Sequence, residues 1–291
     1  MSDLELPAWS EPFVGAAGDP GRLARRMRIR GISREWAWGG ATGAGVRVGI
    51  IDSGLEVDHP ALLGRVVQSV AVEVVDGEPT LVENDTAGDL FGHGTACGGI
   101  IVGLAPEVEL VSIRVLGADL RGKGSAFVAG LEWAVEQGLR VCNLSLSSKS
   151  DALYPVFHEL VDEAYFRGIC LVSAANNVPA PSYPSLFSSV FSIAAHSEPD
   201  PERFYYNPNP PVEFGAWGVD VPIAWRNGGS TVATGNSFAA PHIAGIVARI
   251  VSKHPDLTPF EVKAVLAAIA DNPRPRVRPG TRRAGASVPA G

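Results

Sequence analysis

The sequence predicts an α/β fold with a mainly parallel central sheet flanked by helices. Short apolar runs rich in Val, Ile and Leu alternate with amphipathic stretches over residues 31–271. Runs of this kind, separated by helices, are typical of a parallel sheet with right-handed crossovers. The chain of 291 residues also contains 33 Gly and 23 Pro, which favours an architecture with many tight turns over a helical bundle.

The predicted strands and helices alternate in a regular order. Five apolar runs are predicted as strands, at residues 46–51, 110–115, 138–144, 169–173 and 190–195. Helices are predicted between and after them, at residues 93–102, 125–137, 154–167, 237–253 and 258–270. The last helix has a clear start signal, because Thr258 as N-cap and Glu261 three residues later can form a capping box.

We expect one large domain, since a chain of this length can bury a sizeable core. It is placed at residues 31–271. Residues 1–30 are predicted to be an N-terminal extension without clear periodicity, with one short helix at about residues 23–27. Residues 272–291 are rich in Pro, Arg, Gly and Ala and are predicted to be disordered.

The charge distribution argues against a nucleic-acid-binding protein. The formal net charge is −7, and the two basic stretches, residues 22–30 and 274–283, lie near the chain ends. A large phosphate-binding surface needs clustered Lys and Arg. We therefore expect no nucleic-acid partner, with a basic tail that touches RNA or an acidic protein as the alternative.

The N-terminal residues and the cysteines favour a cytoplasmic protein. The first residues carry acidic side chains where a secretory signal would carry Lys or Arg. No uninterrupted run of about 18 apolar residues occurs, so we expect no membrane span. The cysteines Cys97, Cys142 and Cys170 are too few and odd in number for a disulfide framework, although a single disulfide stays open.

Three polar residues lie where an open α/β sheet places its ligand site, just past apolar runs or at helix starts. Asp52 follows the run at residues 48–51, His93 lies between Gly92 and Gly94, and Ser237 stands where a Gly-rich turn enters a helix. Taken alone, each has a simpler interpretation: a turn residue for Asp52, a capping or packing residue for His93 and an N-cap for Ser237.

The combination is more informative, because acyl transfer needs these three residue types together. A hydroxyl that attacks an amide needs an imidazole to take its proton, and the imidazole needs a carboxylate to fix its tautomer. A serine at a helix N-terminus also gains from the positive end of the helix dipole, since negative charge develops there. The chain order Asp, His, Ser is the order known for subtilisin.

Longer motifs surround these residues: Val48-Gly49-Ile50-Ile51-Asp52-Ser53-Gly54, His93-Gly94-Thr95 and Gly235-Asn236-Ser237-Phe238-Ala239-Ala240-Pro241-His242. They resemble the three active-site signatures of the subtilisin-like (S8 family) serine peptidases, and the similarity covers about residues 31–270. The resemblance implies a subtilisin-like three-layer fold. It also implies a serine endopeptidase that acts on a peptide or protein substrate without a cofactor, with Asp52, His93 and Ser237 as its catalytic triad.

The same resemblance implies an oxyanion hole and a substrate cleft. The oxyanion-hole residue is predicted to be Asn176, with Asn177 as the alternative, and the backbone N–H of Ser237 is the second donor. The implied substrate-binding residues are Ser145, Leu146 and Ser147 on one side and Gly122, Lys123 and Gly124 on the other. A weaker expectation is that Lys123 favours an acidic residue in the substrate.

Several departures from the family pattern change the expectations. The insertion that holds calcium in secreted members is missing after His93, so we expect no metal requirement. Residues 1–30 are too short for the usual prodomain, so we interpret them as a short inhibitory pro-region or as a flexible N-terminal segment.

Cys97 is expected to lie near His93, so thiol reagents that modify Cys97 could inhibit the enzyme. Ser147 and Ser148 stand where the family commonly has Gly, which favours a specialised processing protease. The alternative is a catalytically silent binding or regulatory subunit. The oligomeric state stays open.

Overall fold

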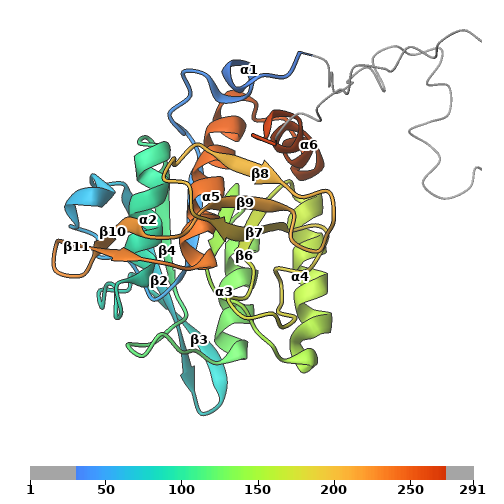
Figure 1. Ribbon diagram of the computed structural model, residues 1–291. Coiled ribbons are helices and arrows are strands. Elements are labelled where there is room, and N and C mark those ends of the chain that lie inside the picture. The colour runs from blue at the N-terminus through green and yellow to red at the C-terminus, as the bar shows by residue number, and fades with distance from the viewer. Residues whose placement is uncertain (1–30, 273–291) are drawn as a thin grey trace, which may run out of the picture.

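The computed structural model describes residues 31–272, and the predicted central sheet is present in it (Figure 1). Nine strands form one sheet in the order β3-β2-β4-β1-β5-β6-β7-β9-β8. All neighbouring pairs from β2 to β9 are parallel, whereas β3 and β8 pair antiparallel at the two edges. The strands are β1 (Arg47–Asp52), β2 (Val66–Val75), β3 (Glu78–Glu83), β4 (Glu109–Arg114), β5 (Val141–Leu144), β6 (Cys170–Ala174), β7 (Phe191–His196), β8 (Phe204–Tyr206) and β9 (Phe214–Trp217).

Helices cover both faces of the sheet, which gives the expected three-layer α/β architecture. The helices α2 (His93–Leu104) and α5 (Asn236–Lys253) pack on one face, and α3 (Gly124–Glu136) and α4 (Tyr154–Phe166) pack on the other. The short α1 (Arg34–Trp38) and the C-terminal α6 (Pro259–Ile269) join the layer of α2 and α5. The two helices that carry His93 and Ser237, α2 and α5, therefore lie on the same side of the sheet.

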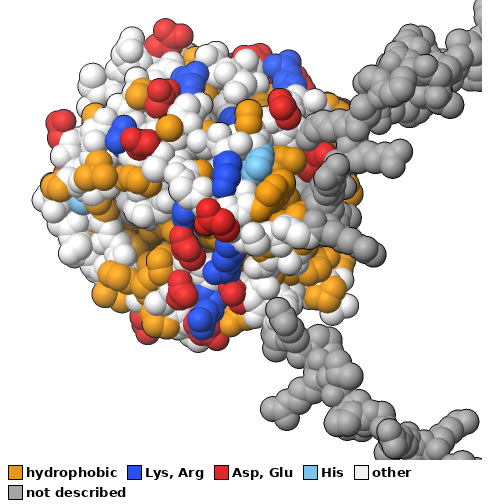
Figure 2. All heavy atoms as spheres, turned by 90° about the horizontal axis from the view of Figure 1, so that it is seen from above, with side chains coloured by type: hydrophobic (Ala, Val, Ile, Leu, Met, Phe, Trp, Pro, Cys, Tyr) orange, Lys and Arg blue, Asp and Glu red, His pale blue; other side chains and the backbone are white. Residues whose placement is uncertain are grey.

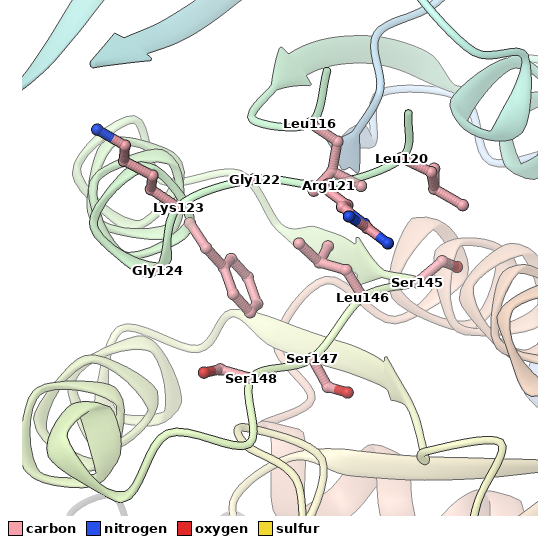
Figure 3. Close-up of a pocket in the computed structure, with 11 residues that line it drawn as sticks. Leu116, Leu120, Arg121, Gly122, Lys123, Gly124, Ser145, Leu146, Ser147 and Ser148 are labelled. Atoms are coloured by element: carbon pink, nitrogen blue, oxygen red, sulfur yellow. The ribbon is translucent and has the colours of Figure 1, made fainter. Parts of the chain in front are cut away.

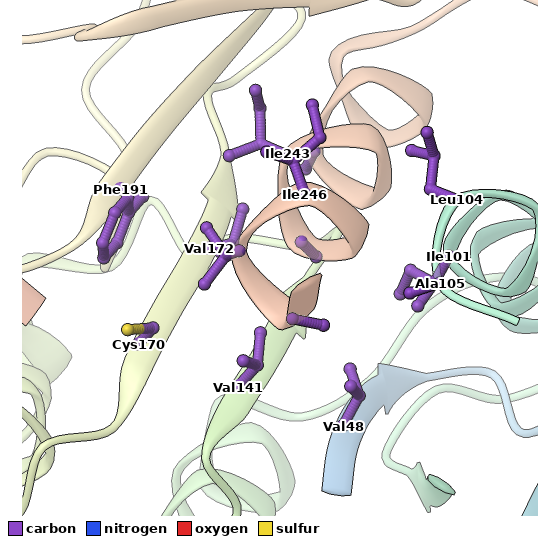
Figure 4. Close-up of a cluster of buried hydrophobic side chains, with 14 of the residues drawn as sticks. Val48, Ile101, Leu104, Ala105, Val141, Cys170, Val172, Phe191, Ile243 and Ile246 are labelled. Atoms are coloured by element: carbon purple, nitrogen blue, oxygen red, sulfur yellow. The ribbon is translucent and has the colours of Figure 1, made fainter. Parts of the chain in front are cut away.

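Alternation along the central strands divides the core into two halves. In β1, Val48 and Ile50 pack in the cluster under α2 and α5, while Ile51 packs in the cluster under α3 and α4. Figure 4 shows the first cluster, where Ile243 and Ile246 of α5 lie between the sheet and α2. Each fully buried side chain of this size stabilises the fold by about 1.5–3 kcal/mol. The helix that carries Ser237 is therefore held rigidly between the sheet and a second helix.

The sequence-based predictions are confirmed for the central elements and were incomplete at the periphery. All five predicted strands and all five predicted helices are present, with ends that differ by up to three residues. The capping box at α6 is formed, since the backbone N–H of Glu261 donates to Thr258 Oγ1 at 3.3 Å and Thr258 N donates to Glu261 Oε2 at 2.8 Å. The extension at residues 1–30, its short helix and the tail beyond residue 272 lie outside the described residues.

The strands that were not predicted lie toward the two edges of the main sheet or outside it. The hairpin β2–β3 is largely solvent-exposed in its outer half, and β10 (Val221–Trp225) and β11 (Gly229–Ala233) form a separate two-stranded sheet. Exposed hairpins lack the continuous apolar run that marks a buried strand, so periodicity gives little signal for them. The described part of the chain also has two short 3₁₀ helices, η2 (Pro60–Leu62) and η3 (Asp151–Leu153).

Charges of both signs are interspersed on the face over α1, α6 and β8 (Figure 2). Several of them pair there, as Arg34 does with Asp271 and Arg203 with Glu198. A single-sign basic patch of the kind that binds phosphate does not occur on this described face. Among residues 31–272, no helix is long and apolar enough to span a bilayer.

Candidate active site

Asp52 and His93 are in direct contact, although 41 residues separate them in the sequence. Asp52 is the last residue of β1 and fully buried, and His93 is the first residue of α2. Both carboxylate oxygens face the ring nitrogen, with distances of 2.8 Å and 2.9 Å from His93 Nδ1. A carboxylate can only accept hydrogen bonds, so Nδ1 carries a proton and the neutral ring keeps Nε2 as an acceptor.

Asp89, which the sequence reasoning missed, holds the loop that delivers His93. Its Oδ1 accepts hydrogen bonds from Ser53 Oγ at 2.7 Å and from the backbone N–H of Phe91 and Gly92. Its Oδ2 accepts from Thr95 N at 2.8 Å and from Thr95 Oγ1. One carboxylate thus ties the end of β1 to the first turn of α2. The Gly92 backbone has a φ of 111°, which a side chain rarely allows.

The His93 ring is buried, and its surroundings shift its pKa. Burial of the ring lowers the pKa, but the Asp52 carboxylate raises it by charge and by its hydrogen bond, and Asp89 adds a smaller attraction in the same direction. The net effect raises the pKa of His93 above its ordinary value. A histidine with a raised pKa binds a proton readily, as a general base must.

Ser237 lies in the first turn of α5 and lines the same cavity as His93. The cavity has a volume of about 150 Å³, and its wall includes His93, Ser145, Asn176, Asn177 and Ser237. No hydrogen bond joins the Ser237 hydroxyl to the His93 ring among the described contacts. His93 and Ser237 therefore line one cavity, and Asp52 contacts the His93 ring from the buried side.

Asn236 fixes the start of α5 to the ends of two strands. Its Oδ1 accepts a hydrogen bond from Ala195 N at 2.8 Å, and its Nδ2 donates to the carbonyls of Ala175 and Asn176, both at 3.1 Å. Its backbone N–H donates to Asn177 Oδ1 at 2.9 Å. The Asn236 side chain therefore sets the position of the helix start, and the Asn236 backbone N–H holds the Asn177 amide oxygen.

The two neighbouring asparagines have different environments. Asn176 Oδ1 accepts a hydrogen bond from Val178 N at 3.1 Å, so its side chain closes a turn within its own loop. Asn177 is turned toward α5 instead. A Cβ placed on Gly235 would lie 3.1 Å from Ser237 Oγ and 3.7 Å from Asn177 Nδ2, which puts these two polar atoms beside the same point. Both asparagines line the cavity of His93 and Ser237, and a hydrogen bond holds the side-chain oxygen of each.

Comparison with known proteins gives the family. The model of the Subtilase family (Peptidase S8) matches residues 43–285. The chain belongs to this family.

The similarity extends over most of the subtilase chain. The chain is 33% identical to Subtilisin DY of Bacillus licheniformis, over 80% of this chain and 86% of that protein. It is also 33% identical to Subtilisin BL of Lederbergia lenta, over 77% of this chain and 82% of the relative. Among solved structures, a cold adapted subtilisin-like serine proteinase matches with a TM-score of 0.63 and 26% identity, covering 78% of this chain and 83% of that one. The subtilase is thus a serine endopeptidase of the hydrolase class.

Behind the site, the subtilase has a buried polar layer that the sequence only partly indicated. Ser145 Oγ donates to the carbonyl of Ser237 at 2.8 Å, and Cys97 Sγ lies 3.3 Å from Ser145 Oγ and 3.9 Å from Asp52 Oδ2. Cys97 therefore lies near the predicted catalytic pair, as expected. It is fully buried and is not among the residues that line the cavity, so reagents in the cavity do not reach it. Burial, with the nearby Asp52 charge, raises the pKa of the Cys97 thiol well above its ordinary value.

Asp52, His93 and Cys97 are also the one group among residues 31–272 whose geometry could hold a metal ion. Their ligand atoms lie within 4.8 Å of one another, and all three side chains are buried. An ion there would replace the proton that Asp52 and His93 share. The set therefore suits proton transfer better than a resident metal, and the absence of a metal requirement stays a prediction.

A larger cavity of about 460 Å³ continues from the cavity that His93 and Ser237 line (Figure 3). Two chain segments form opposite walls, and they contain all the substrate-binding residues that the sequence predicted. One wall is residues 120–124, with Gly122, Lys123 and Gly124, and the other is residues 145–148, with Ser145, Leu146 and Ser147. Leu120 and residues 145–147 line both cavities, so the two form one continuous cleft.

Proposed function

We propose that this subtilase hydrolyses peptide bonds through an acyl-enzyme intermediate, with Ser237 as nucleophile, His93 as general base and Asp52 as the orienting carboxylate. The observation that carries the proposal is the contact of both Asp52 oxygens with His93 Nδ1, beside a cavity that Ser237 shares. The carboxylate fixes the proton on Nδ1, which leaves Nε2 free to accept one from the serine hydroxyl. Hydrogen bonds between catalytic groups are often long or poorly aligned without substrate and tighten when it binds.

The reaction then runs in two balanced halves. Ser237 Oγ forms a bond to the scissile carbonyl carbon while its proton passes to His93 Nε2. Collapse of the tetrahedral intermediate breaks the C–N bond, and His93 returns the proton to the leaving amine. A water molecule repeats the same steps on the acyl-enzyme and releases the second product. Asp52 stays ionised throughout and stabilises the imidazolium.

For the oxyanion hole, Asn177 is the stronger proposal than Asn176. The Asn177 amide is anchored through its oxygen by the backbone N–H of Asn236, which leaves Nδ2 free to donate. That nitrogen and Ser237 lie beside the same point near Gly235. Together with the backbone N–H of Ser237 at the start of α5, Nδ2 would supply two donors to the developing negative charge.

Labelling with a fluorophosphonate tests the nucleophile. The wild-type protein should form one covalent adduct, located at Ser237 by peptide mapping, and the Ser237→Ala variant should form none. His93→Ala should slow labelling strongly while the melting temperature stays close to that of wild type. Absence of labelling in the folded wild-type protein would support the alternative, a catalytically silent binding or regulatory subunit.

We further propose that the enzyme acts on a narrow set of substrates in the cytoplasm. The cleft wall includes Ser147 and Ser148, whose side chains add bulk that glycine would not. All three cysteines, Cys97, Cys142 and Cys170, are free and buried, which is compatible with a reducing compartment. Rapid digestion of unfolded casein at many sites would contradict the specialised role, whereas cleavage of few peptides in a proteome-derived library would support it.

A further inference from the structure

The larger cavity of the cleft, defined above by residues 120–124 and 145–148, differs in charge from the rest of the protein. The whole chain carries a formal net charge of −7. Yet Arg121 and Lys123 are the charged residues that line this cavity, and no Asp or Glu lines it. The positive charge of this cavity is therefore a property of the site, because it is opposite in sign to the net charge of the protein.

Neither cation is neutralised by the part of the chain that the structure describes. Within residues 31–272, no carboxylate lies within ion-pair distance of Arg121 or Lys123, whereas other arginines, such as Arg114 with Asp85, are paired. The nearest acidic residue in the sequence, Asp119, is folded back onto its own turn and accepts from the backbone N–H of Arg121 at 3.2 Å. The guanidinium of Arg121 therefore remains available to a ligand.

The two cations do not contribute equally. In Figure 3 the Arg121 side chain extends between Leu120 and Leu146. The Lys123 side chain points away from residues 145–148. Arg121 is thus the residue placed to contact a side chain in the cavity, and Lys123 adds charge only at the rim. The sequence had pointed to Lys123 alone.

The rest of the lining suits a side chain with an apolar stem. Leu116, Phe127 and Leu146 provide apolar surface, and Ser147 and Ser148 follow Leu146 in its wall. In the facing wall, Gly122 and Gly124 add no side chains beside Arg121 and Lys123. A glutamate would place its methylene groups against the apolar surface and its carboxylate near the Arg121 guanidinium, which can bind it with two hydrogen bonds.

We propose that this cavity selects substrates with an acidic side chain a few residues from the scissile bond, and that Arg121 is the residue that recognises it. The inference rests on the proposed peptidase function and names its substrate class. Because Arg121 is exposed, the interaction is screened by salt.

Mass-spectrometric profiling of cleavages in a proteome-derived peptide library tests the proposal, with Ser237→Ala as the inactive control. Wild type should show enrichment of Glu and Asp at one position near the cleavage site. Two fluorogenic peptides that differ only by Glu or Gln at that position then give a ratio of kcat/KM. We expect about three- to tenfold in favour of Glu at low salt, and a smaller ratio at high salt.

Variants separate Arg121 from general electrostatics. Arg121→Gln should bring the Glu-to-Gln ratio close to one, and Arg121→Glu should favour a Lys peptide over the Glu peptide. Arg167→Gln, which removes an exposed arginine at the far end of α4, is the matched control and should keep the wild-type ratio. Equal cleavage of both peptides by wild type, or an unchanged ratio in Arg121→Glu, would overturn the inference and leave the peptidase function intact. Absence of any Ser237-dependent cleavage would instead overturn the proposed function, and this inference with it.

Discussion

His93 Nδ1 lies 2.8 Å and 2.9 Å from the two oxygens of a fully buried Asp52. The pair joins the carboxyl end of β1 to the first residue of α2. Asp52 is also held in place by the backbone N–H of Ser53, which donates to Oδ1 at 2.7 Å. The geometry fixes both the tautomer and the direction of the ring, and the predictions below follow from it.

Asp52→Asn should nearly abolish peptidase activity without unfolding the protein. An amide in place of the carboxylate presents a donor or a weaker acceptor to Nδ1, so the ring can adopt the wrong tautomer. We expect kcat to fall by about 10⁴, measured on a fluorogenic peptide. A near-native melting temperature is the control, and a loss of less than about tenfold would contradict the assigned role of Asp52.

The pH profile should reflect the raised pKa of His93. As a general base the ring must be neutral, so a higher pKa keeps it protonated and inactive up to a higher pH. We expect the acid limb of the kcat/KM profile to have its midpoint above 6.5, the ordinary value for histidine. A midpoint clearly below that value would show that burial outweighs the two carboxylates.

Asp89→Asn should impair catalysis by loosening the loop before His93. The amide nitrogen would face the Thr95 N–H that now donates to Oδ2, and one negative charge near the ring would be lost. We expect kcat to fall by about tenfold with little change in KM, and the acid limb to move to lower pH. Asp76→Asn, at the exposed tip of the β2–β3 hairpin, is the control. Equal effects of the two substitutions would show that Asp89 has no specific role.

The two asparagines should respond differently to removal. Asn177→Ala should lower kcat by about 10² to 10³, because a donor to the oxyanion is lost. Asn177→Asp keeps an oxygen for the backbone N–H of Asn236 and should be equally inactive. Asn176→Ala should retain activity within a few fold. The reverse pattern, with Asn176 as the sensitive position, would restore the assignment that the sequence suggested.

Cys97 should be inert in the folded enzyme. Burial raises the pKa of its thiol, so little of the reactive thiolate is present, and the side chain does not line the cavity. Iodoacetamide should leave activity unchanged in native buffer and should alkylate all three cysteines once the protein is unfolded in urea. Rapid inhibition accompanied by modification of Cys97 would contradict the buried position.

The sequence by itself determined the family, the alternation of strands and helices, and the identity of Asp52, His93 and Ser237 as the residues to examine. These features are local: apolar runs report buried strands, and short motifs around a strand end or a helix start keep their spacing.

Only the tertiary structure decided which side chains contact one another. Asn176 and Asn177 are adjacent and chemically identical, and only the family resemblance gave Asn176 as the first choice. The backbone N–H of Asn236, 59 residues further along the chain, holds the Asn177 oxygen, and Asn177 Nδ2 lies beside the same point as Ser237 Oγ. Asp89 resembles any loop aspartate until the fold brings Ser53 and Thr95 to its two oxygens. Arg121 stands out from Lys123 only where residues 145–148 form the facing wall. Such choices depend on the packing of distant segments, which local sequence patterns do not encode.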